Sequence, residues 1–536
     1  MCDKNSSCHI FIFPFQWDYI GRKVSPKEHI PYNDRADIRA FDRLYSEVSP
    51  LKRSYFKIGQ SAKYYNEYVY FHPFARKALY GTEENESVYY YELDAADGVY
   101  SINIRTAKFS KTYDLTLDRV SVHVFDTGVG IVSFSLKNTK YTDEEDILRI
   151  NDFGRRLYPQ FLKEDNRLGA KNRFLADSIS GHIGSLNFYE DFRQYEESIE
   201  HRSAFLSPDH IRQVFGYSPT DQVGDPWCKF VFRDEDERAG TIRISPIMDD
   251  RMYFLSYYYN KELSDKIKEC KRSRSFRDRI GSLCRGGNQP KYAYEVGSKK
   301  DFWSRYMFGD GLDLGIANGD MQLSETQRCT YARWVESGTL IGITRDSSVY
   351  LTNWDLIETH FTSMYYQMAI LCLVQRASVL RFSGEIANLT EEILGKKKKV
   401  GKHIKGLYEN YIRFLNQIFF REVTSQIQGI EMYEMFQRNM NIERDVKALD
   451  EEMAELFNYL EIDEQGKLNK VANVYLPLAL LTGLFGINTF ADDGWFKWLF
   501  AFGGNGMTWS IGDTFTTVII AMCLYFPIRY HIKNRK

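Results

Sequence analysis

Apolar and polar residues alternate with a period of two through much of residues 1–290. This spacing is typical of β-strands that bury one face. The clearest pair of runs is SVHVF and VGIVSFSL, which are joined by Asp126-Thr127-Gly128. That joining composition suits a tight turn. We therefore predict a β-hairpin at this point and a strand-rich N-terminal half.

From about residue 353 the hydrophobic period changes to 3.6. Apolar residues recur by threes and fours over residues 361–393, which predicts a single helix of about 40 residues. A second helix is predicted over residues 407–435, beyond a run of four lysines, with a break near residues 437–441. A third carries apolar residues spaced 4-3-4-3-4 over residues 442–460, the pattern of a coiled-coil seam. A helix packed on neighbours within its own subunit explains that spacing equally well.

Two stretches near the end of the chain carry almost no charge. No side chain between Lys470 and Asp492 is charged, and residues 511–528 include one acid, Asp513. At about 1.5 Å per helical residue, each stretch spans a bilayer core of about 30 Å. Four bases lie beyond the second stretch, and the positive-inside rule then places both termini in the cytoplasm. These features predict a multi-pass protein of the cell inner (plasma) membrane.

The predicted fold class is α+β, with a cytosolic mixed β/α domain, a long coiled-coil-like stalk and two C-terminal transmembrane helices. The predicted division has a cytosolic ligand-sensing domain at 1–350, a stalk at 351–470, and transmembrane helices at 471–490 and 511–530. An outer loop at 491–510 joins the two spans, and a basic cytosolic tail follows at 531–536.

Composition and motifs argue against several classes of function. Lys+Arg 70 and Asp+Glu 72 nearly cancel, so net charge gives no reason to expect direct nucleic-acid binding. The eight cysteines form no C-x-x-C pair, and Cys2, Cys8 and His9 lack a fourth ligand for a tetrahedral ion, so no metal site is assigned. The sequence contains no H-E-x-x-H motif, P-loop or nucleophile–base signature, and we do not expect an enzyme.

Two basic clusters are candidates for binding an anionic ligand, because guanidinium groups bind phosphate oxygens through paired hydrogen bonds. One closes a predicted helix and the other lies within residues 271–279. Their candidate ligand-binding residues are Arg149, Asp152, Arg155 and Arg156 in the first cluster, and Arg274 and Arg277 in the second. Ordinary ion pairs on a solvated surface are the alternative explanation for both.

The third predicted helix is strongly acidic. Residues 443–464 contain nine acids and two bases, and several such helices in a ring would concentrate cations. A solvated helix face is the alternative. Beyond this helix, Asn488 offers an uncharged amide that could hold a hydrated cation, while Gly486 and Asn488 also suit a helix C-cap.

The stretch YLPLALLTGLFGINTF resembles the first transmembrane helix of the CorA superfamily of divalent-cation channels. That family has a cytosolic β/α domain, a long stalk helix, a Gly-Met-Asn motif, a second span and a basic tail, and residues 350–536 are similar to it in this order. The resemblance implies a homo-oligomer, a pentamer in that family, with a selectivity filter at Gly486, Ile487 and Asn488. It also implies a pore lined by one helix face, at Leu468, Ala472, Leu476, Ala479 and Gly483.

The sequence departs from the family pattern at two points. Ile487 replaces the central Met, and residues 491–495 replace the acidic-Pro outer loop, so the conducted ion stays open. The long soluble part, with DFGRRLYP at 152–159, is more similar to CorA-like proteins associated with type III CRISPR defence. This resemblance implies an antiviral cation channel gated by a nucleotide second messenger, with a divalent cation such as Mg²⁺ as a further ligand. The alternatives are a constitutive magnesium/cobalt/zinc-type transporter regulated by its own ion, and a non-conducting membrane-anchored sensor.

Overall fold

The computed structural model describes residues 6–488 with internal gaps. The gaps are residues 22–35, 83–86, 106–108, 159–174, 194–207, 217–227, 232–239, 248–250, 273–293, 312–314 and 396–399. The chain divides into two compact units, Met1–Glu452 and Met453–Lys536. The first unit holds the sheet and most of the helices, and it is described first.

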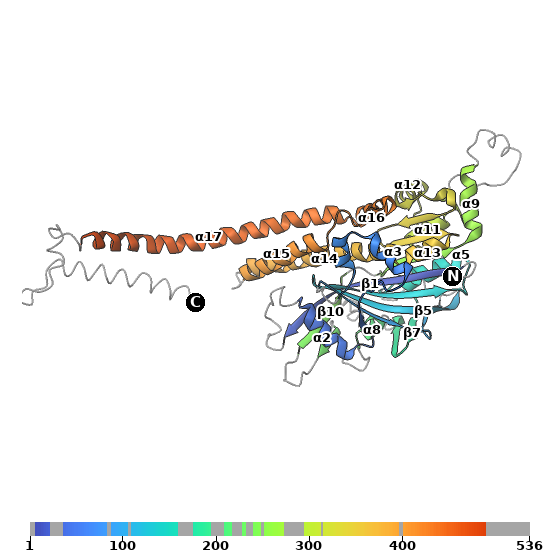
Figure 1. The fold of residues 1–536 in the computed structure, drawn as a ribbon, viewed down its shortest axis with the longest axis horizontal. Coiled ribbons are helices and arrows are strands. Elements are labelled where there is room, and N and C mark those ends of the chain that lie inside the picture. Colours follow the sequence, from blue (N-terminus) through green and yellow to red (C-terminus); the bar gives the residue numbers. More distant parts are fainter. Residues whose placement is uncertain are drawn as a thin grey trace, which may run out of the picture. The chain divides into compact units, whose positions relative to one another are not determined.

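The first unit is built around one sheet of 14 strands (Figure 1). The strands are β1 (Ser7–Gly21), β2 (Lys52–Ser54), β3 (Val88–Asp94), β4 (Val99–Arg105), β5 (Ser110–Phe125), β6 (Val129–Asn138), β7 (Ser178–Ile183), β8 (Leu186–Asp191), β9 (Cys228–Val231), β10 (Gly240–Pro246), β11 (Tyr253–Tyr259), β12 (Thr330–Tyr331), β13 (Leu340–Ile343) and β14 (Ser347–Thr352). The main path runs β12-β13-β14-β11-β1-β6-β5-β4-β7-β8, with β10, β9, β3 and β2 as branches. Among these described strands, β11 and β14 form the one parallel pair.

Three helices begin where a short polar side chain accepts hydrogen bonds from the first free backbone N–H groups. Asp37, Ser61 and Asn318 do this for α2, α3 and α12. The described helices are α2 (Ile38–Val48), α3 (Ala62–Tyr70), α4 (Pro73–Leu79), α5 (Glu144–Arg155), α8 (Asp209–Val214), α9 (Lys261–Arg272), α11 (Phe302–Phe308), α12 (Gly319–Cys329), α13 (Asp355–Phe361), α14 (Met364–Leu394), α15 (Val400–Gln417), α16 (Ile427–Asn439) and α17 (Ile442–Asn488).

The two faces of the sheet carry different helices, because successive side chains of a strand point to opposite faces. On one face, the Tyr366 hydroxyl of α14 donates to Ser133 Oγ of β6 at 3.1 Å. On the other face, the Phe11 ring of β1 lies so close to Gly154 of α5 that no Cβ would fit there. The core therefore has a layer of side chains on each side of the central strands.

The predicted hairpin at residues 126–128 is confirmed, since β5 and β6 pair antiparallel across it. Gly128 has φ +74°, a backbone conformation that glycine adopts without strain, and the Arg381 guanidinium occupies the space where a Cβ would stand. Arg381 donates to the carbonyls of Trp17 and Gly128 and pairs with Asp18 at 2.7 Å. These contacts fasten α14 to the end of the hairpin.

The single helix predicted over residues 361–393 is wrong at its start. Two helices, α13 and α14, are separated by Thr362 and Ser363, and Ser363 has φ −133° and ψ −103°. The hydroxyls of Thr362 and Ser363 donate to backbone carbonyls one turn earlier, at Glu358 and Thr359. Such bonds offer the backbone an alternative to helix continuation.

Helix α17 runs from the first unit into the second. Within the first unit, the predicted seam residues Ile442, Val446 and Leu449 are buried in this single chain. This burial favours a helix packed on its neighbours within the subunit. In the second unit, Leu468 and Leu476 are 68% and 70% exposed.

The predicted architecture with two C-terminal transmembrane helices is wrong. Among the described residues, no helix combines the length and the apolar character needed to cross a membrane. The prediction counted charges alone, and the uncharged stretch before Asp492 also contains Asn473, Tyr475 and Asn488. The second expected span, at 511–530, lies outside the described residues. What the structure has is a mixed α/β fold with one large sheet.

Candidate ligand-binding cleft

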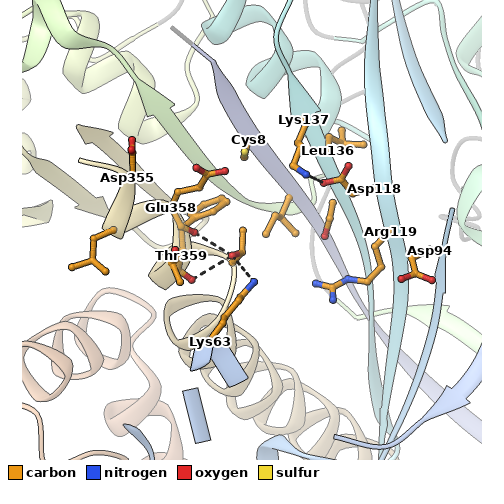
Figure 2. Close-up of a pocket in the computed structure, with 15 residues that line it drawn as sticks. Cys8, Lys63, Asp94, Asp118, Arg119, Leu136, Lys137, Asp355, Glu358 and Thr359 are labelled. Carbon is orange, nitrogen blue, oxygen red and sulfur yellow. Dashed lines mark hydrogen bonds and ion pairs between the residues drawn. The ribbon is translucent and has the colours of Figure 1, made fainter. Parts of the chain in front are cut away.

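A cavity of about 670 Å³ lies beside the centre of the sheet (Figure 2). Side chains from β1, α3, β3, β5, β6 and α13 line it. Its charged lining consists of Lys63, Asp94, Asp118, Arg119, Lys137, Asp355 and Glu358. The outer cavity, as we call it, thus offers three cations together with carboxylates that accept hydrogen bonds.

An irregularity in β5 shapes this lining. The register between β5 and β6 shifts between Leu117 and Arg119, so Asp118 is the extra residue of a bulge. A bulge re-aims the side chains next to it. Here both Asp118 and Arg119 line the outer cavity, and the Asp118 carboxylate pairs with Lys137 at 2.7 Å (Figure 2).

Lys63 connects the cavity to the break between α13 and α14. Its ammonium donates to Thr362 Oγ1 at 3.0 Å, and the lysine reaches there from α3 (Figure 2). Burial lowers the pKa of Lys63, and the nearby Glu67 carboxylate partly offsets that effect. A ligand that contacts Lys63 would therefore also touch the junction of two helices.

A second cavity, of about 270 Å³, shares Lys63, Arg119 and Thr362 with the outer one, and we call it the inner cavity. Aromatic rings dominate its lining. Phe56 and Tyr80 have ring centroids 4.1 Å apart, and Tyr90 and His123 have centroids 4.7 Å apart. Tyr64 and Tyr366 add two more rings to the wall. The cleft as a whole joins a charged chamber to a ring-lined one.

The arrangement suits the three parts of a nucleotide. Lys63, Arg119 and Lys137 are residue types that bind phosphate oxygens. Aromatic rings stack on planar bases. Carboxylates such as Asp355 and Glu358 accept hydrogen bonds from sugar hydroxyls. A simple inorganic anion would gain nothing from these acids, which argues for a ligand with hydroxyl groups.

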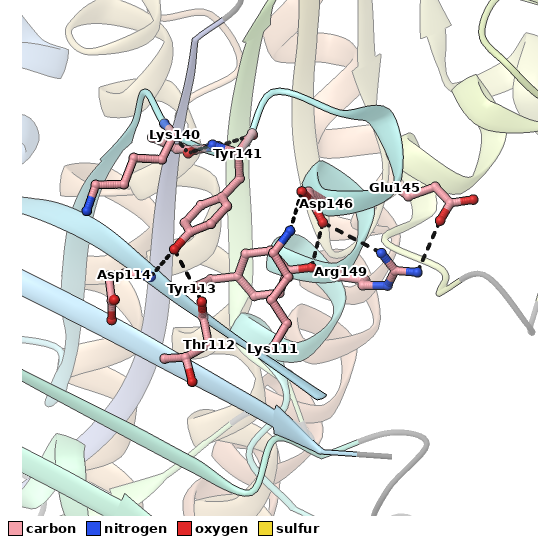
Figure 3. A network of polar contacts seen from close by, with 10 residues as sticks. Lys111, Thr112, Tyr113, Asp114, Lys140, Tyr141, Glu145, Asp146 and Arg149 are labelled. Carbon is pink, nitrogen blue, oxygen red and sulfur yellow. Dashed lines mark hydrogen bonds and ion pairs between the residues drawn. The ribbon is translucent and has the colours of Figure 1, made fainter. Parts of the chain in front are cut away.

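The first predicted arginine cluster, which begins at Arg149, lies outside the cleft, and its side chains form ion pairs within the fold. Arg149 pairs with Glu145 at 3.1 Å and lies 3.6 Å from Asp146, which also accepts from Lys111 and Tyr113 (Figure 3). It is part of a network between α5 and β5. Such a network positions a helix and leaves little capacity for a ligand.

Arg155 and Arg156 are buried at the end of α5. Arg155 is 1% exposed, and its Nη2 donates to the carbonyls of Phe308 and Gly309 at 3.0 and 2.8 Å. Burial lowers the pKa of Arg155 to about 10. Arg156 pairs with buried Asp152 at 2.7 Å. These groups hold α5, α11 and the following loop together.

Among the residues that the structure describes, none of the other predicted site residues lines the outer or the inner cavity. Arg274 and Arg277 lie outside the described residues. The expected pore and filter residues all belong to α17, where Leu468, Ala472, Leu476 and Ala479 are exposed and Gly483, Gly486, Ile487 and Asn488 stand near its end. Within the described part of the chain, no group of three His, Cys, Asp or Glu side chains is placed to hold a metal ion.

Sequence reasoning missed every cation of the outer cavity. Lys63, Arg119 and Lys137 stand on three elements, 18 or more residues apart, so no local cluster marks them. The one available signal was in β5, where Asp118-Arg119 interrupts a strict alternation of polar and apolar residues.

No protein-family model matches this sequence, and no curated protein matches it. The resemblance to the CorA superfamily therefore stays a prediction drawn from a short motif and the order of parts.

Proposed function

We propose that this protein is a sensor that binds a nucleotide-class ligand in the two-chambered cleft. The observation that carries the proposal is that a chamber lined by cations and carboxylates adjoins an aromatic one, with Lys63, Arg119 and Thr362 lining both. Phosphates would occupy the outer cavity and a base the inner one. Of the three functions predicted from the sequence, the sensor depends least on the C-terminal region.

The location of the cleft supports a signalling role. Thr362 separates α13 from α14, and α14 contacts the helical region through Gln375, which donates to Ile418 O and Tyr433 Oη at 2.8 and 2.9 Å. A ligand that displaces the Lys63–Thr362 hydrogen bond would change the junction at the start of α14. Packed helices pass on such a change because they have discrete arrangements.

The predicted antiviral cation channel, its homo-oligomer and its divalent cation stay predictions, as does the constitutive transporter. These predictions were drawn from the CorA resemblance, which needed two membrane spans. The nucleotide activator is the part of that hypothesis that the cleft supports.

Isothermal titration of the full chain with tripolyphosphate and the four ribonucleoside triphosphates tests the sensor. We expect Lys63→Gln and Arg119→Gln each to weaken binding at least tenfold, or about 1.4 kcal/mol, because each removes a cation from the cleft. Lys77→Gln is the matched control, since Lys77 is exposed on α4 and does not line the cleft. Absence of binding by every probe, or equal losses in the control, would refute the proposal.

A further inference from the structure

Three residues that line the inner cavity each have a buried polar atom without a hydrogen-bond partner among the described residues. They are Arg119 Nε, His123 Nδ1 and Gln367 Oε1. Buried polar atoms in folded proteins are nearly always hydrogen-bonded, so each exception needs a reason. Three exceptions in the wall of one cavity point to something that completes them.

The orientation of Gln367 is fixed by a neighbour. Its Nε2 donates to Glu67 Oε1 at 3.1 Å, and Glu67, 4% exposed, also accepts from the Tyr80 hydroxyl at 3.3 Å. An amide whose N–H₂ group faces a carboxylate must present its oxygen on the other side. Gln367 therefore offers the inner cavity an acceptor.

His123 is 2% exposed and uncharged. Burial, helped by the positive charge of Arg119, lowers the pKa of His123 to about 3. The neutral imidazole lies tilted against the rings of Tyr90 and Tyr366, with centroid distances of 4.7 and 6.3 Å. It adds a polar edge without a charge, whereas Arg119 Nε adds an N–H donor that keeps its hydrogen at every physiological pH.

The resulting wall has a fixed acceptor, a fixed donor and a neutral imidazole among aromatic rings. A planar nitrogen heterocycle with a donor and an acceptor on neighbouring positions of one edge would satisfy these atoms. An aliphatic group would leave all three atoms unpaired.

We infer that the inner cavity is a base-reading subsite, in which Gln367 Oε1 accepts from the heterocycle and Arg119 Nε donates to it. This inference rests on the proposed nucleotide sensor. It assigns base discrimination to Gln367, His123 and Arg119, and it separates these residues from Lys137, which faces only the outer cavity.

The test compares base-bearing and base-free probes on the purified full chain by isothermal titration. We expect at least one of the four ribonucleoside triphosphates to bind ten or more times tighter than tripolyphosphate. We expect Gln367→Met, which keeps the side-chain length and removes the acceptor, to reduce that ratio at least fivefold while tripolyphosphate binding changes little.

A second pair of variants guards against misfolding of the Gln367 variant. Tyr64 lines the inner cavity and is 43% exposed, whereas its neighbour Tyr65 is 56% exposed and does not line it. Tyr64→Ala should therefore lower nucleotide affinity without loss of the fold. Tyr65→Ala should leave nucleotide affinity unchanged. Nucleotides that bind no tighter than tripolyphosphate, or a ratio unchanged in both Gln367→Met and Tyr64→Ala, would overturn the base-reading subsite and leave the sensor standing. If tripolyphosphate and all four nucleotides fail to bind, the sensor itself is wrong.

Discussion

The end of α5 and the cleft beside β5 both gather basic side chains, and they use them in opposite ways. At the end of α5, Arg155 and Arg156 are buried and bonded to carbonyl and carboxylate oxygens of the fold. In the cleft, the Arg119 guanidinium pairs with Glu92 at the longer distance of 3.8 Å. Arg119 and Arg155 each have a buried Nε without a hydrogen-bond partner among the described residues, so the two sites differ in how closely the terminal guanidinium nitrogens are bonded. The arginines at the end of α5 hold the fold together, whereas Arg119 is bonded less closely and lines a cavity.

This difference teaches that a cluster of arginines in a sequence indicates charge and says nothing about its availability. A run of bases on one helix tends to find acids one turn away, as Arg149 does with Glu145. Cations that come from separate elements meet only in the fold. Their partners are then set by the tertiary structure.

The largest expected effect on stability comes from breaking the buried ion pair at the end of α5. Arg156→Met leaves the buried Asp152 carboxylate without its 2.7 Å partner, and we expect unfolding free energy to fall by about 3–5 kcal/mol. Urea denaturation of the full chain measures this. Lys137→Met, which breaks a largely solvated pair with Asp118, should cost about 1 kcal/mol or less. The comparison between the two sites fails if both variants lose the same stability.

A second, intermediate effect concerns two buried histidines. Burial lowers the pKa of His9 to about 4 and that of His123 to about 3. Both folded values lie below the value of about 6.5 in an unfolded chain, so the unfolded state binds more protons in acid. Stability is therefore present above pH 6.5 and is lost as the pH falls toward 4, by about 2 kcal/mol per histidine at pH 5. Urea denaturation at pH 7 and pH 5 measures the loss.

His9 and His123 also differ in whether their ring nitrogens are hydrogen-bonded within the fold. His9 is hydrogen-bonded to Asn151 at 2.7 Å and to Ser7 at 2.8 Å, whereas His123 Nδ1 has no partner among the described residues. His123→Phe should therefore reduce the acid sensitivity with little cost at pH 7. His9→Phe should cost about 1–3 kcal/mol at pH 7, because it leaves Asn151 unsatisfied. Equal costs at pH 7 would contradict this assignment.

The smallest expected effect is a gain in binding. Asp118→Asn removes a carboxylate that pairs with Lys137 and so lowers the negative charge of the outer-cavity lining. We expect tripolyphosphate affinity to rise a few-fold, about 0.5–1 kcal/mol, by isothermal titration. Asp114→Asn is the control, because Asp114 is exposed on β5 outside the cavity. A loss of affinity in Asp118→Asn would show that this acid contacts the ligand directly.

The sequence was most informative where one local pattern decides the structure. Alternation around Asp126-Thr127-Gly128 predicted the β5–β6 hairpin, because turn chemistry and strand period agree there. The break at Thr362–Ser363 was missed since neither residue is Gly or Pro and the apolar spacing continues through it. The transmembrane prediction is overturned because no helix among the described residues is long and apolar enough to cross a membrane.

The cleft was beyond sequence reasoning for a geometric reason. Its lining extends from Cys8 to Gln367 and comes from at least six elements of the sheet and helices. The cations meet because β5 is bulged at Asp118 and α3 lies near α13, neither of which follows from hydrophobic period. Only the arrangement of strands in space reveals which side chains stay unpaired.

The position of β1 in the sheet has a consequence for how the chain folds during synthesis. This strand precedes all three of its partners in the chain, β6, β10 and β11, the last of which ends at Tyr259. Its apolar run, Ile10 to Phe15, gains its first partner when β6 is complete at Asn138, and the other edge of β1 stays open until β10 and β11 have been made. Contacts between such distant segments form slowly and leave exposed strand edges open to aggregation. We expect production of this protein to depend on chaperones and on translation speed more than its final stability would suggest.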